Sequence, residues 1–155
     1  MTTPSKSGTP ARAAAAIEID DAVLVQAGRI ADEAGTELYV VGGYVRDKLL
    51  GRSVTDVDIL VIGDGIAFAR TVARELGRRQ VVAFEKFGTA MIPLEDRKIE
   101  FVSAREESYE PSSRKPTVRK ATLESDLSRR DFTVNAMAIS MLSALCHCCR
   151  IRNSN

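Results

Sequence analysis

The stretch YVVGGYVRDKLLGRSVTDVDILVIG, which runs from Tyr39 to Gly63, decides the fold of this 155-residue chain. It holds two adjacent glycines between two strand-like runs, and Asp56 and Asp58 at the start of the second run. Because side chains alternate across a strand, the two aspartates point the same way, about 7 Å apart. Two like charges this close repel each other unless a cation lies between them, so the pair indicates a site.

Outward from this stretch, the spacing of apolar residues predicts alternating helices and strands. Predicted helices cover 19–35, 44–51, 65–77 and 125–145, predicted strands cover 37–41, 57–63, 80–84, 89–94 and 98–104, and a polar, basic, mobile loop covers 105–124. The strand at 57–63 is apolar enough to be buried on both faces. The predicted fold class is therefore α/β, an α+β mixed sheet with flanking helices.

Composition excludes several classes of protein. The chain has 22 basic and 21 acidic residues, so no overall field attracts it to nucleic acid or to a membrane. No apolar run approaches the roughly 20 residues that span a bilayer. His147 is the only histidine and lies beside Cys146, Cys148 and Cys149 near the end, which excludes histidine-based catalysis from the rest of the chain. Because the cysteines are confined to this segment, we expect a reducing, cytoplasmic location.

The paired aspartates have two interpretations. Carboxylate oxygens are the hard ligands that Mg²⁺ prefers, and the ion commonly takes one or two of them while phosphates and water fill the remaining positions. In the other interpretation, Asp56 caps a turn and Asp58 is a solvated residue at the start of a strand. A lone D-x-D pair does not decide between them.

The glycines upstream favour a phosphate site. Gly42 and Gly43 follow a strand and open a helix, where glycine lets a phosphate approach the backbone amides. Arg46 lies one turn further and can add a charge-assisted hydrogen bond to a phosphate oxygen. The alternatives are a tight turn for the glycines and a local ion pair for Arg46 and Asp47.

Taken together, GGYVRDKLLGRSVTDVDILVIG closely resembles the signature of the class II nucleotidyltransferases, the bacterial-type CCA-adding tRNA nucleotidyltransferases and poly(A) polymerases. SRRDFTVNAMAIS resembles the second motif of that family, and FEKFGTAMI and IEFVSAREESY resemble the strands between the two motifs. The resemblance runs from about Val23 to Ser140. It implies a nucleotidyltransferase (polymerase-beta-like) catalytic head.

The resemblance also implies roles for residues. Asp56 and Asp58 would bind two Mg²⁺ ions, and Gly42 and Gly43 would contact the triphosphate. Glu100 is the candidate for a third catalytic carboxylate, although a solvent-facing strand residue is an equal interpretation. The second motif assigns three further residues to the nucleotide, namely Arg130, Asp131 and Asn135. An ion pair near a helix start is the alternative for the first two.

The function implied is template-independent addition of CCA to the 3′ end of tRNA, with ATP and CTP as substrates and pyrophosphate released. The alternatives are poly(A) addition to RNA 3′ ends and a non-catalytic fragment that binds nucleoside triphosphate and Mg²⁺. The basic residues of the polar loop, Arg114, Lys115, Arg119 and Lys120, could contact RNA or remain solvated.

Three regions are expected: a disordered leader at 1–17, the catalytic head at 18–140 and a divergent tail at 141–155. The family continues with neck, body and tail domains, and its neck selects the base. We therefore expect a head without those domains, and a second polypeptide could supply them.

Overall fold

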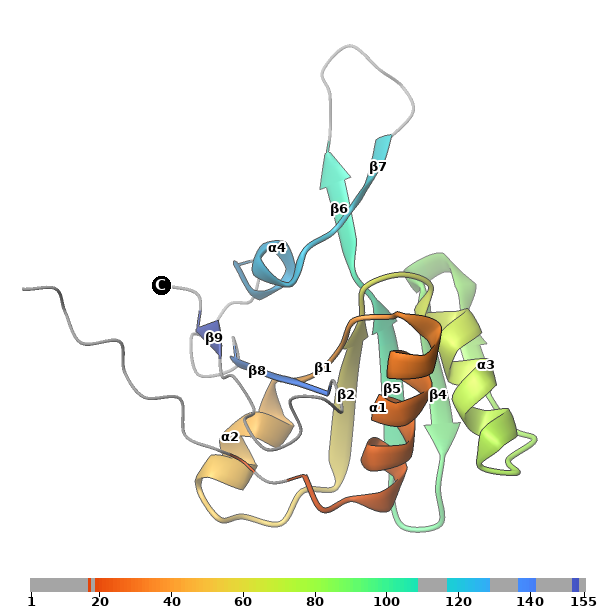
Figure 1. Cartoon of the computed structure of the whole chain (residues 1–155), viewed down its shortest axis with the longest axis vertical. Coiled ribbons are helices and arrows are strands. Elements are labelled where there is room, and N and C mark those ends of the chain that lie inside the picture. Colours follow the sequence, from red (N-terminus) through yellow and green to blue (C-terminus); the bar gives the residue numbers. More distant parts are fainter. Residues whose placement is uncertain (1–16, 18, 109–116, 129–136, 142–151, 154–155) are drawn as a thin grey trace, which may run out of the picture.

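The computed structural model describes residues 17, 19–108, 117–128, 137–141 and 152–153. In this part of the chain the helices are α1 Ala22–Ala34, α2 Gly43–Leu49, α3 Gly65–Glu75 and α4 Leu123–Ser128, with a 3-10 turn η1 at Glu85–Phe87. The strands are β1 Leu38–Val41, β2 Asp56–Val61, β3 Val82–Phe84, β4 Thr89–Pro93, β5 Lys98–Ser103, β6 Arg105–Ser108, β7 Thr117–Lys120, β8 Met137–Ser140 and β9 Arg152–Asn153. The predicted α/β class with a mixed sheet is confirmed (Figure 1).

Most of the strands in the described residues belong to one mixed sheet. Its strand order is β3-β4-β5-β2-β1-β8-β9, and β2 and β5 form a parallel pair while the pairs on either side are antiparallel. A parallel pair requires a crossover, and the segment between β2 and β5 that contains α3 provides it. The strands β2 and β5 therefore lie at the centre of the sheet.

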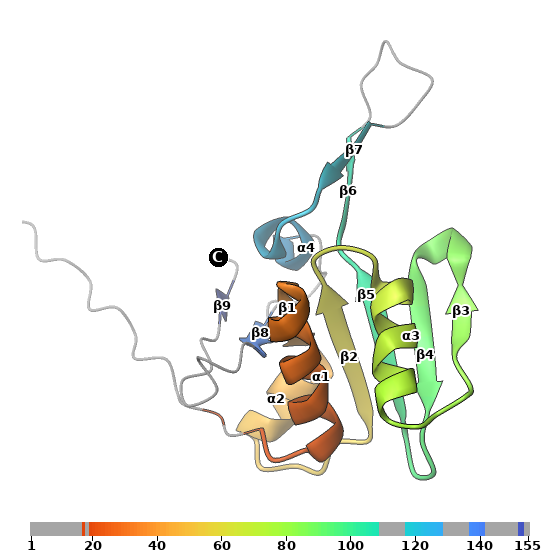
Figure 2. The same ribbon diagram turned by 45° about the vertical axis from the view of Figure 1, so that its right-hand side comes forward.

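The main core lies between the sheet and the helices α1 and α3, which Figures 1 and 2 show side by side on one face. Ile59 of β2 and Phe101 of β5 are fully buried there, and Phe101 packs on Phe68 of α3 with ring centroids 5.9 Å apart. On the opposite face, Leu60 contacts a second apolar cluster that includes Leu127 of α4. The prediction that this strand is buried on both faces is thus confirmed for residues 59–61 only, because Asp56 is exposed and Asp58 is partly exposed.

Helix ends follow the capping residues of the sequence. Asp21 accepts hydrogen bonds from the amides of Val23 and Leu24 and so begins α1, and Asp64 begins α3 in the same way. Gly35 ends α1 with φ of 62°, a left-handed conformation that favours glycine. These caps fix both helices against the sheet.

The prediction of a polar, basic, mobile loop at 105–124 is wrong in part, because the described residues of this range include two strands and the start of a helix. The backbones of β6 and β7 pair in an antiparallel arm that extends from the end of β5 away from the main sheet (Figure 1), and α4 begins at Leu123. The strongly polar composition hid the strands, because a two-stranded arm needs no apolar face to pair its backbone.

The prediction of a continuous helix over 125–145 is also wrong. In the part of this range that the structure describes, α4 is helical as far as Ser128, whereas Met137–Ser140 is the strand β8, which pairs with β1 in antiparallel register. Ala138 and Ile139 are both buried, one in each apolar cluster. A strand buried on both faces shows no alternation of polar and apolar residues, so its sequence is readily taken for a helix.

The expected leader lies almost wholly outside the described residues, and in the expected tail only Met141 and β9 are described, with β9 pairing with β8. The domain boundaries near residues 18 and 140 stay predictions. None of the helices in the described ranges is long and apolar enough to cross a membrane.

Candidate active site

Asp56 and Asp58 lie on the face of β2 that points away from the main core. Val57 and Ile59, between and beyond them, are buried in that core, whereas Asp56 is exposed and Asp58 is partly exposed. The strand geometry expected from the sequence therefore places both carboxylates on one face. Further along the same face, Leu60 is covered by α4, so the open part of the face begins at the aspartates.

Glu100 joins this face through the strand register. In the parallel pair of β2 and β5, Asp58 is the partner of Glu100 and Asp56 is the partner of Lys98. Ile99 and Phe101, on either side of Glu100, point into the main core. Neighbouring residues in register project to the same side of a sheet, so three acidic residues on adjacent strands share one face.

The glycine turn lies at the same end of the sheet as the aspartates. Val41, the last residue of β1, pairs with Asp58, and Gly42 and Gly43 follow directly. Gly42 has φ of 70° and ψ of −131°, which residues with a side chain rarely adopt, and its amide donates to the carbonyl of Met137 at 3.2 Å. The turn is therefore both fixed and close to the acidic face.

Gly43 differs from Gly42 in that a side chain would fit. A Cβ added at Gly43 would have Arg46 Nη2 at 3.5 Å as its nearest neighbour, an ordinary contact. Arg46 thus lies beside the glycine turn, as expected for a residue that shares a ligand with the turn.

Arg46 itself forms the local ion pair that was the alternative interpretation. Its Nε donates to Asp47 Oδ1 at 2.9 Å and its Nη2 donates to Asp47 Oδ2 at 3.0 Å. This hydrogen bonding lowers the pKa of Asp47 and raises that of Arg46. A phosphate role for Arg46 stays a prediction, and it would require the guanidinium to serve both partners.

The donor set fits a magnesium ion held together with a phosphate substrate. Among the described residues, no three Asp, Glu, His or Cys side chains are grouped closely enough to hold a metal ion by themselves. Mg²⁺ commonly takes one or two protein carboxylates and completes its shell with phosphate oxygens and water. Asp56 and Asp58 lie on one face and would supply those two carboxylates.

Other predicted site residues lie outside the described part of the chain. Arg130, Asp131 and Asn135 fall in the gap before β8, and Arg114 and Lys115 fall in the gap between β6 and β7. Only the backbone of β7 is described at Arg119 and Lys120. The Cys and His residues at 146–149 are likewise not described.

A hollow that the sequence did not predict lies on the acidic face beside Glu100. It has a volume of about 320 Å³ and is lined by Phe84, Phe87, Thr89, Met91, Lys98 and Glu100. The two phenylalanines are 45% and 66% exposed. The available signal was the pair of aromatic residues in FEKF, which stand at a strand end where no core position explains them.

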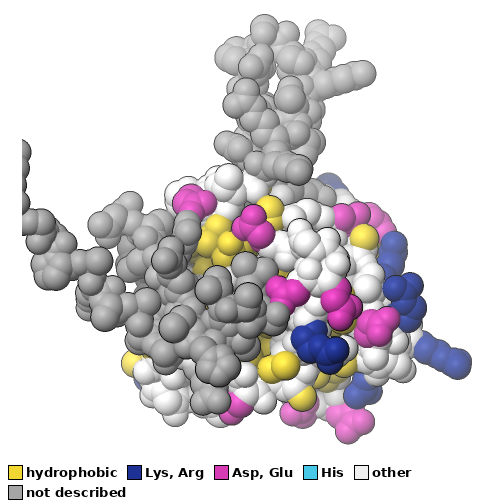
Figure 3. Space-filling model, viewed as in Figure 1, with side chains coloured by type: hydrophobic (Ala, Val, Ile, Leu, Met, Phe, Trp, Pro, Cys, Tyr) yellow, Lys and Arg dark blue, Asp and Glu magenta, His cyan; other side chains and the backbone are white. Residues whose placement is uncertain are grey.

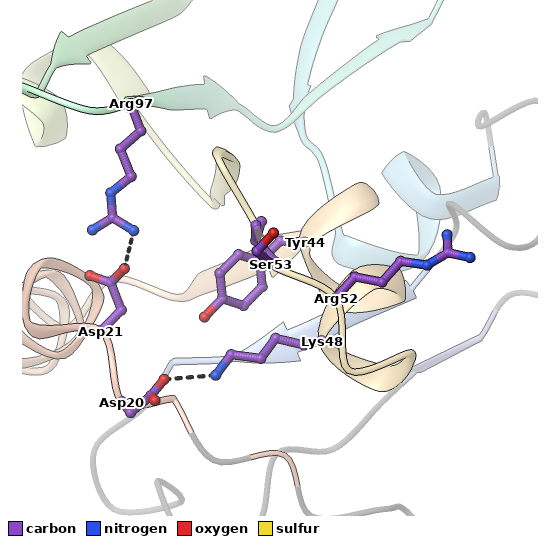
Figure 4. Close-up of a pocket in the computed structure, with 8 residues that line it drawn as sticks. Asp20, Asp21, Tyr44, Lys48, Arg52, Ser53 and Arg97 are labelled. Carbon is purple, nitrogen blue, oxygen red and sulfur yellow. Dashed lines mark hydrogen bonds and ion pairs between the residues drawn. The ribbon is translucent and has the colours of Figure 1, made fainter.

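A second hollow of about 320 Å³ lies where the start of α1, the end of α2 and the turn between β4 and β5 meet (Figure 4). Asp21 forms an ion pair with Arg97 there, and Asp20 forms one with Lys48 at 2.7 Å. Each acidic residue is thus matched by a basic one. Residues from three separate parts of the fold thus line this hollow.

Both signs of charge occur across the described surface. Figure 3 shows acidic side chains spread over the visible face, while most of the basic ones lie along the right-hand edge, where Figure 1 places α3, and one basic patch lies near the centre. Arg70 and Arg74 of α3 are exposed. The acidic and basic side chains, although nearly equal in number, are therefore not evenly distributed over the surface.

Comparison with known proteins identifies the fold and the family. Residues 38–149 match the poly A polymerase head domain. The chain is 46% identical over 121 residues to an A-adding tRNA nucleotidyltransferase of Geobacter sulfurreducens, covering 77% of this chain and 14% of that protein. It is 38% identical over 114 residues to a CCA-adding enzyme of Bacillus subtilis, covering 72% of this chain and 28% of that protein.

Among solved structures, the chain resembles a tRNA nucleotidyltransferase complexed with a primer tRNA and an incoming ATP analog. The TM-score is 0.65 and the identity 46%, over 76% of this chain and 32% of that one. The chain thus spans about a third or less of these relatives. It belongs to the class II nucleotidyltransferase family, the CCA-adding tRNA nucleotidyltransferases and poly(A) polymerases, and it corresponds to their catalytic head.

Proposed function

We propose that this chain is a catalytic head that transfers nucleotides from nucleoside triphosphates to the 3′ end of RNA, in the addition of CCA to tRNA. The observation that supports this most strongly is the register that brings Asp56, Asp58 and Glu100 to one face beside the glycine turn. That arrangement offers an acidic, metal-binding surface next to backbone amides able to hold a phosphate.

The reaction is an attack by the RNA 3′-hydroxyl oxygen on the α-phosphorus of the nucleotide. A new oxygen–phosphorus bond forms, the bond to the bridging oxygen breaks, and pyrophosphate leaves with the electron pair. Bound Mg²⁺ would supply charge stabilisation for the attacking and leaving oxygens. Asp56 and Asp58 would orient the substrate phosphates through the ions they hold.

The other residues of the face have separate tasks in this proposal. The amides at Gly42 and Gly43 hold the β- and γ-phosphates, and Arg46 adds charge to the same end. Glu100 lies on the other side of Asp58 and accepts the proton that the 3′-hydroxyl loses. Arg130, Asp131 and Asn135 are proposed to bind the nucleotide, with Asp131 accepting from the ribose 2′-hydroxyl.

For the substrates we propose ATP and CTP, and for the acceptor the 3′ end of tRNA. The names of the relatives favour this choice, since one is A-adding and one CCA-adding, and the solved complex contains a primer tRNA. Poly(A) addition is the second candidate, because the matching family model is that of a poly A polymerase head. A second polypeptide and a cytoplasmic location stay predictions.

The test uses two labelled tRNAs, one lacking the terminal A and one lacking CCA, with ATP, CTP and Mg²⁺. We expect extension by the chain, and a loss of about 100-fold or more in Asp58→Asn, which keeps the side-chain shape but removes the charge. Glu33→Gln is the matched control, because Glu33 is exposed on α1, across the sheet.

A second variant tests the phosphate site without disturbing the fold. Gly43→Ala adds a methyl group that the structure accommodates, so the free energy of unfolding should be unchanged while the affinity for ATP falls.

Extension of the tRNAs by Asp58→Asn at the wild-type rate would refute the assignment of Asp58 to the metal site. Tight ATP binding without any extension would instead favour the non-catalytic alternative.

A further inference from the structure

We infer that the hollow lined by Phe84 and Phe87 is the docking site for the last bases of the RNA acceptor, which stack on the two rings. This inference rests on the proposed function and adds to it the side from which the RNA enters. It also gives a binding role to two exposed aromatic residues for which the sequence predicted no function.

The direction of entry follows from the strand order. In an in-line displacement the attacking oxygen and the leaving group lie on opposite sides of the phosphorus. The glycine turn that holds the leaving pyrophosphate follows β1, on one side of β2. The attacking hydroxyl must then come from the other side of β2, where β5, β4 and β3 follow in order.

The register places the phenylalanines on that side and on the correct face. Met91 of β4 is the partner of Glu100, and Thr89 is the partner of Phe84. Phe84 therefore shares the acidic face, and the 3-10 turn η1 brings Phe87 to the same hollow. The hollow is thus continuous with Glu100, the residue proposed to face the hydroxyl.

The chemistry of the hollow suits single-stranded RNA. Exposed aromatic rings provide stacking surfaces for bases whatever their identity, which an acceptor with a changing last base requires. Lys98 lines the hollow and can contact a backbone phosphate, and Lys86 Nζ lies 5.9 Å from the centre of the Phe87 ring. The nearby acidic residues are Glu100, beside the metal site, and Glu85, which pairs with Arg70 at 3.2 Å.

Photochemical crosslinking tests the position of the RNA. The probe is an RNA acceptor stem that ends in single-stranded ACC with 5-iodocytidine as its last nucleotide, irradiated with the whole chain. Trypsin cuts after Arg79, Lys86 and Arg97, so Phe84 and Phe87 lie on separate peptides. We expect the crosslink on one or both of these peptides, and a crosslink confined to other peptides, or none, would overturn the inference.

Affinity measurements test the stacking itself. Phe87→Ala should weaken binding of the same RNA about five-fold or more, whereas Phe87→Tyr, which keeps a ring, should bind like the wild type. Val25→Ala is the control, because Val25 is 41% exposed on α1, which packs on the opposite face. Lys98→Gln should lower the slope of log affinity against log salt by about one, and Phe87→Ala should leave that slope unchanged.

Binding of Mg²⁺ and ATP separates the two proposals. If the phenylalanine variants bind Mg²⁺ and ATP normally and also bind RNA like the wild type, the docking site is wrong and the proposed function stands. If the wild-type chain binds no Mg²⁺ and ATP and extends no RNA, the proposed function itself fails. A variant that changes self-association but not RNA affinity would also overturn the docking site.

Discussion

Asp21 caps the start of α1 and at the same time forms an ion pair with Arg97 from the turn between β4 and β5. The two side chains are only 12% and 19% exposed. Burial by itself raises the pKa of Asp21, but hydrogen bonds from Arg97 and from the amides of Leu24 and Val23 together outweigh it. The pKa is therefore held below its ordinary value of 3.8.

Asp21→Asn should destabilise the chain in a pH-dependent way. Asparagine is also a good N-cap, so the variant removes mainly the charge pair, worth about 1 kcal/mol at pH 7. Because the pKa is lower in the folded chain than in the unfolded one, this stability is present above the unfolded value and is lost as the pH falls through the folded one. Urea unfolding of both proteins from pH 7 to pH 3 measures the difference.

The neighbouring residue provides the control for this prediction. Asp20 also pairs with a basic side chain, Lys48, but it is 76% exposed, so Asp20→Asn should change stability little at any pH. A difference between wild type and Asp21→Asn that stayed constant from pH 7 to pH 3 would show that the charge of Asp21 does not contribute as argued.

Residues whose role depends on local spacing could be predicted from the sequence. The D-x-D spacing alone places Asp56 and Asp58 on one face of a strand, and the double glycine marks the turn. The position of Glu100 beside Asp58 depends on a parallel pairing of strands some forty residues apart, which no local pattern specifies. The hollow at Phe87 was missed for the same reason, because it forms only when β3, β4 and β5 come together.

At the scale of elements, the helices and central strands were predictable because their apolar periodicity matches one buried face. The strand β8, near the end of the described chain, was not predictable from its local sequence. In Met137–Ser140 only Ile139 has a strong strand preference, and the segment becomes a strand because β1 offers unpaired backbone groups at its open edge. Tertiary pairing here overrides the local pattern.

The packing of α1 against the chain that follows β8 yields a prediction about Gly28. A Cβ added at Gly28 would lie 2.6 Å from the backbone oxygen of Met141, whose amide is itself fixed by the carbonyl of Leu38 at 2.9 Å. Gly28→Ala should therefore lower the free energy of unfolding by about 1–3 kcal/mol, because overpacking outweighs the gain of about 1 kcal/mol in helix propensity. The urea concentration at the midpoint of unfolding measures this loss of stability, provided that the free energy of unfolding depends on urea with the same slope in both proteins.

Arg29→Ala, on the exposed side of the same helix, is the matched variant and should be neutral or slightly stabilising. If Gly28→Ala were as stable as Arg29→Ala, the close approach of α1 to residue 141 would not exist in solution.

At the scale of the whole molecule, the net charge of +1 gives no general attraction to RNA or nucleotides, so ligand binding must come from the local arrangement on the acidic face. That face is open at Asp56 and closed by α4 at Leu60. The opening lies between the glycine turn and the hollow at Phe87. Binding there should therefore depend on the assembled sheet.

A ligand that binds only the folded chain raises its stability, which allows the site to be tested without any catalysis. At 100 times its dissociation constant, ATP with Mg²⁺ should add about 2.7 kcal/mol, equivalent to about 5–10 °C in melting temperature for a chain of this size. We expect this rise in melting temperature for the wild type with ATP and Mg²⁺, and a much smaller rise when EDTA replaces Mg²⁺. Asp58→Asn should show only the smaller rise, whether Mg²⁺ is present or not. Thermal melting monitored by circular dichroism measures these melting temperatures. An equal rise with and without Mg²⁺ in the wild type would contradict a nucleotide bound to the aspartates through a metal ion.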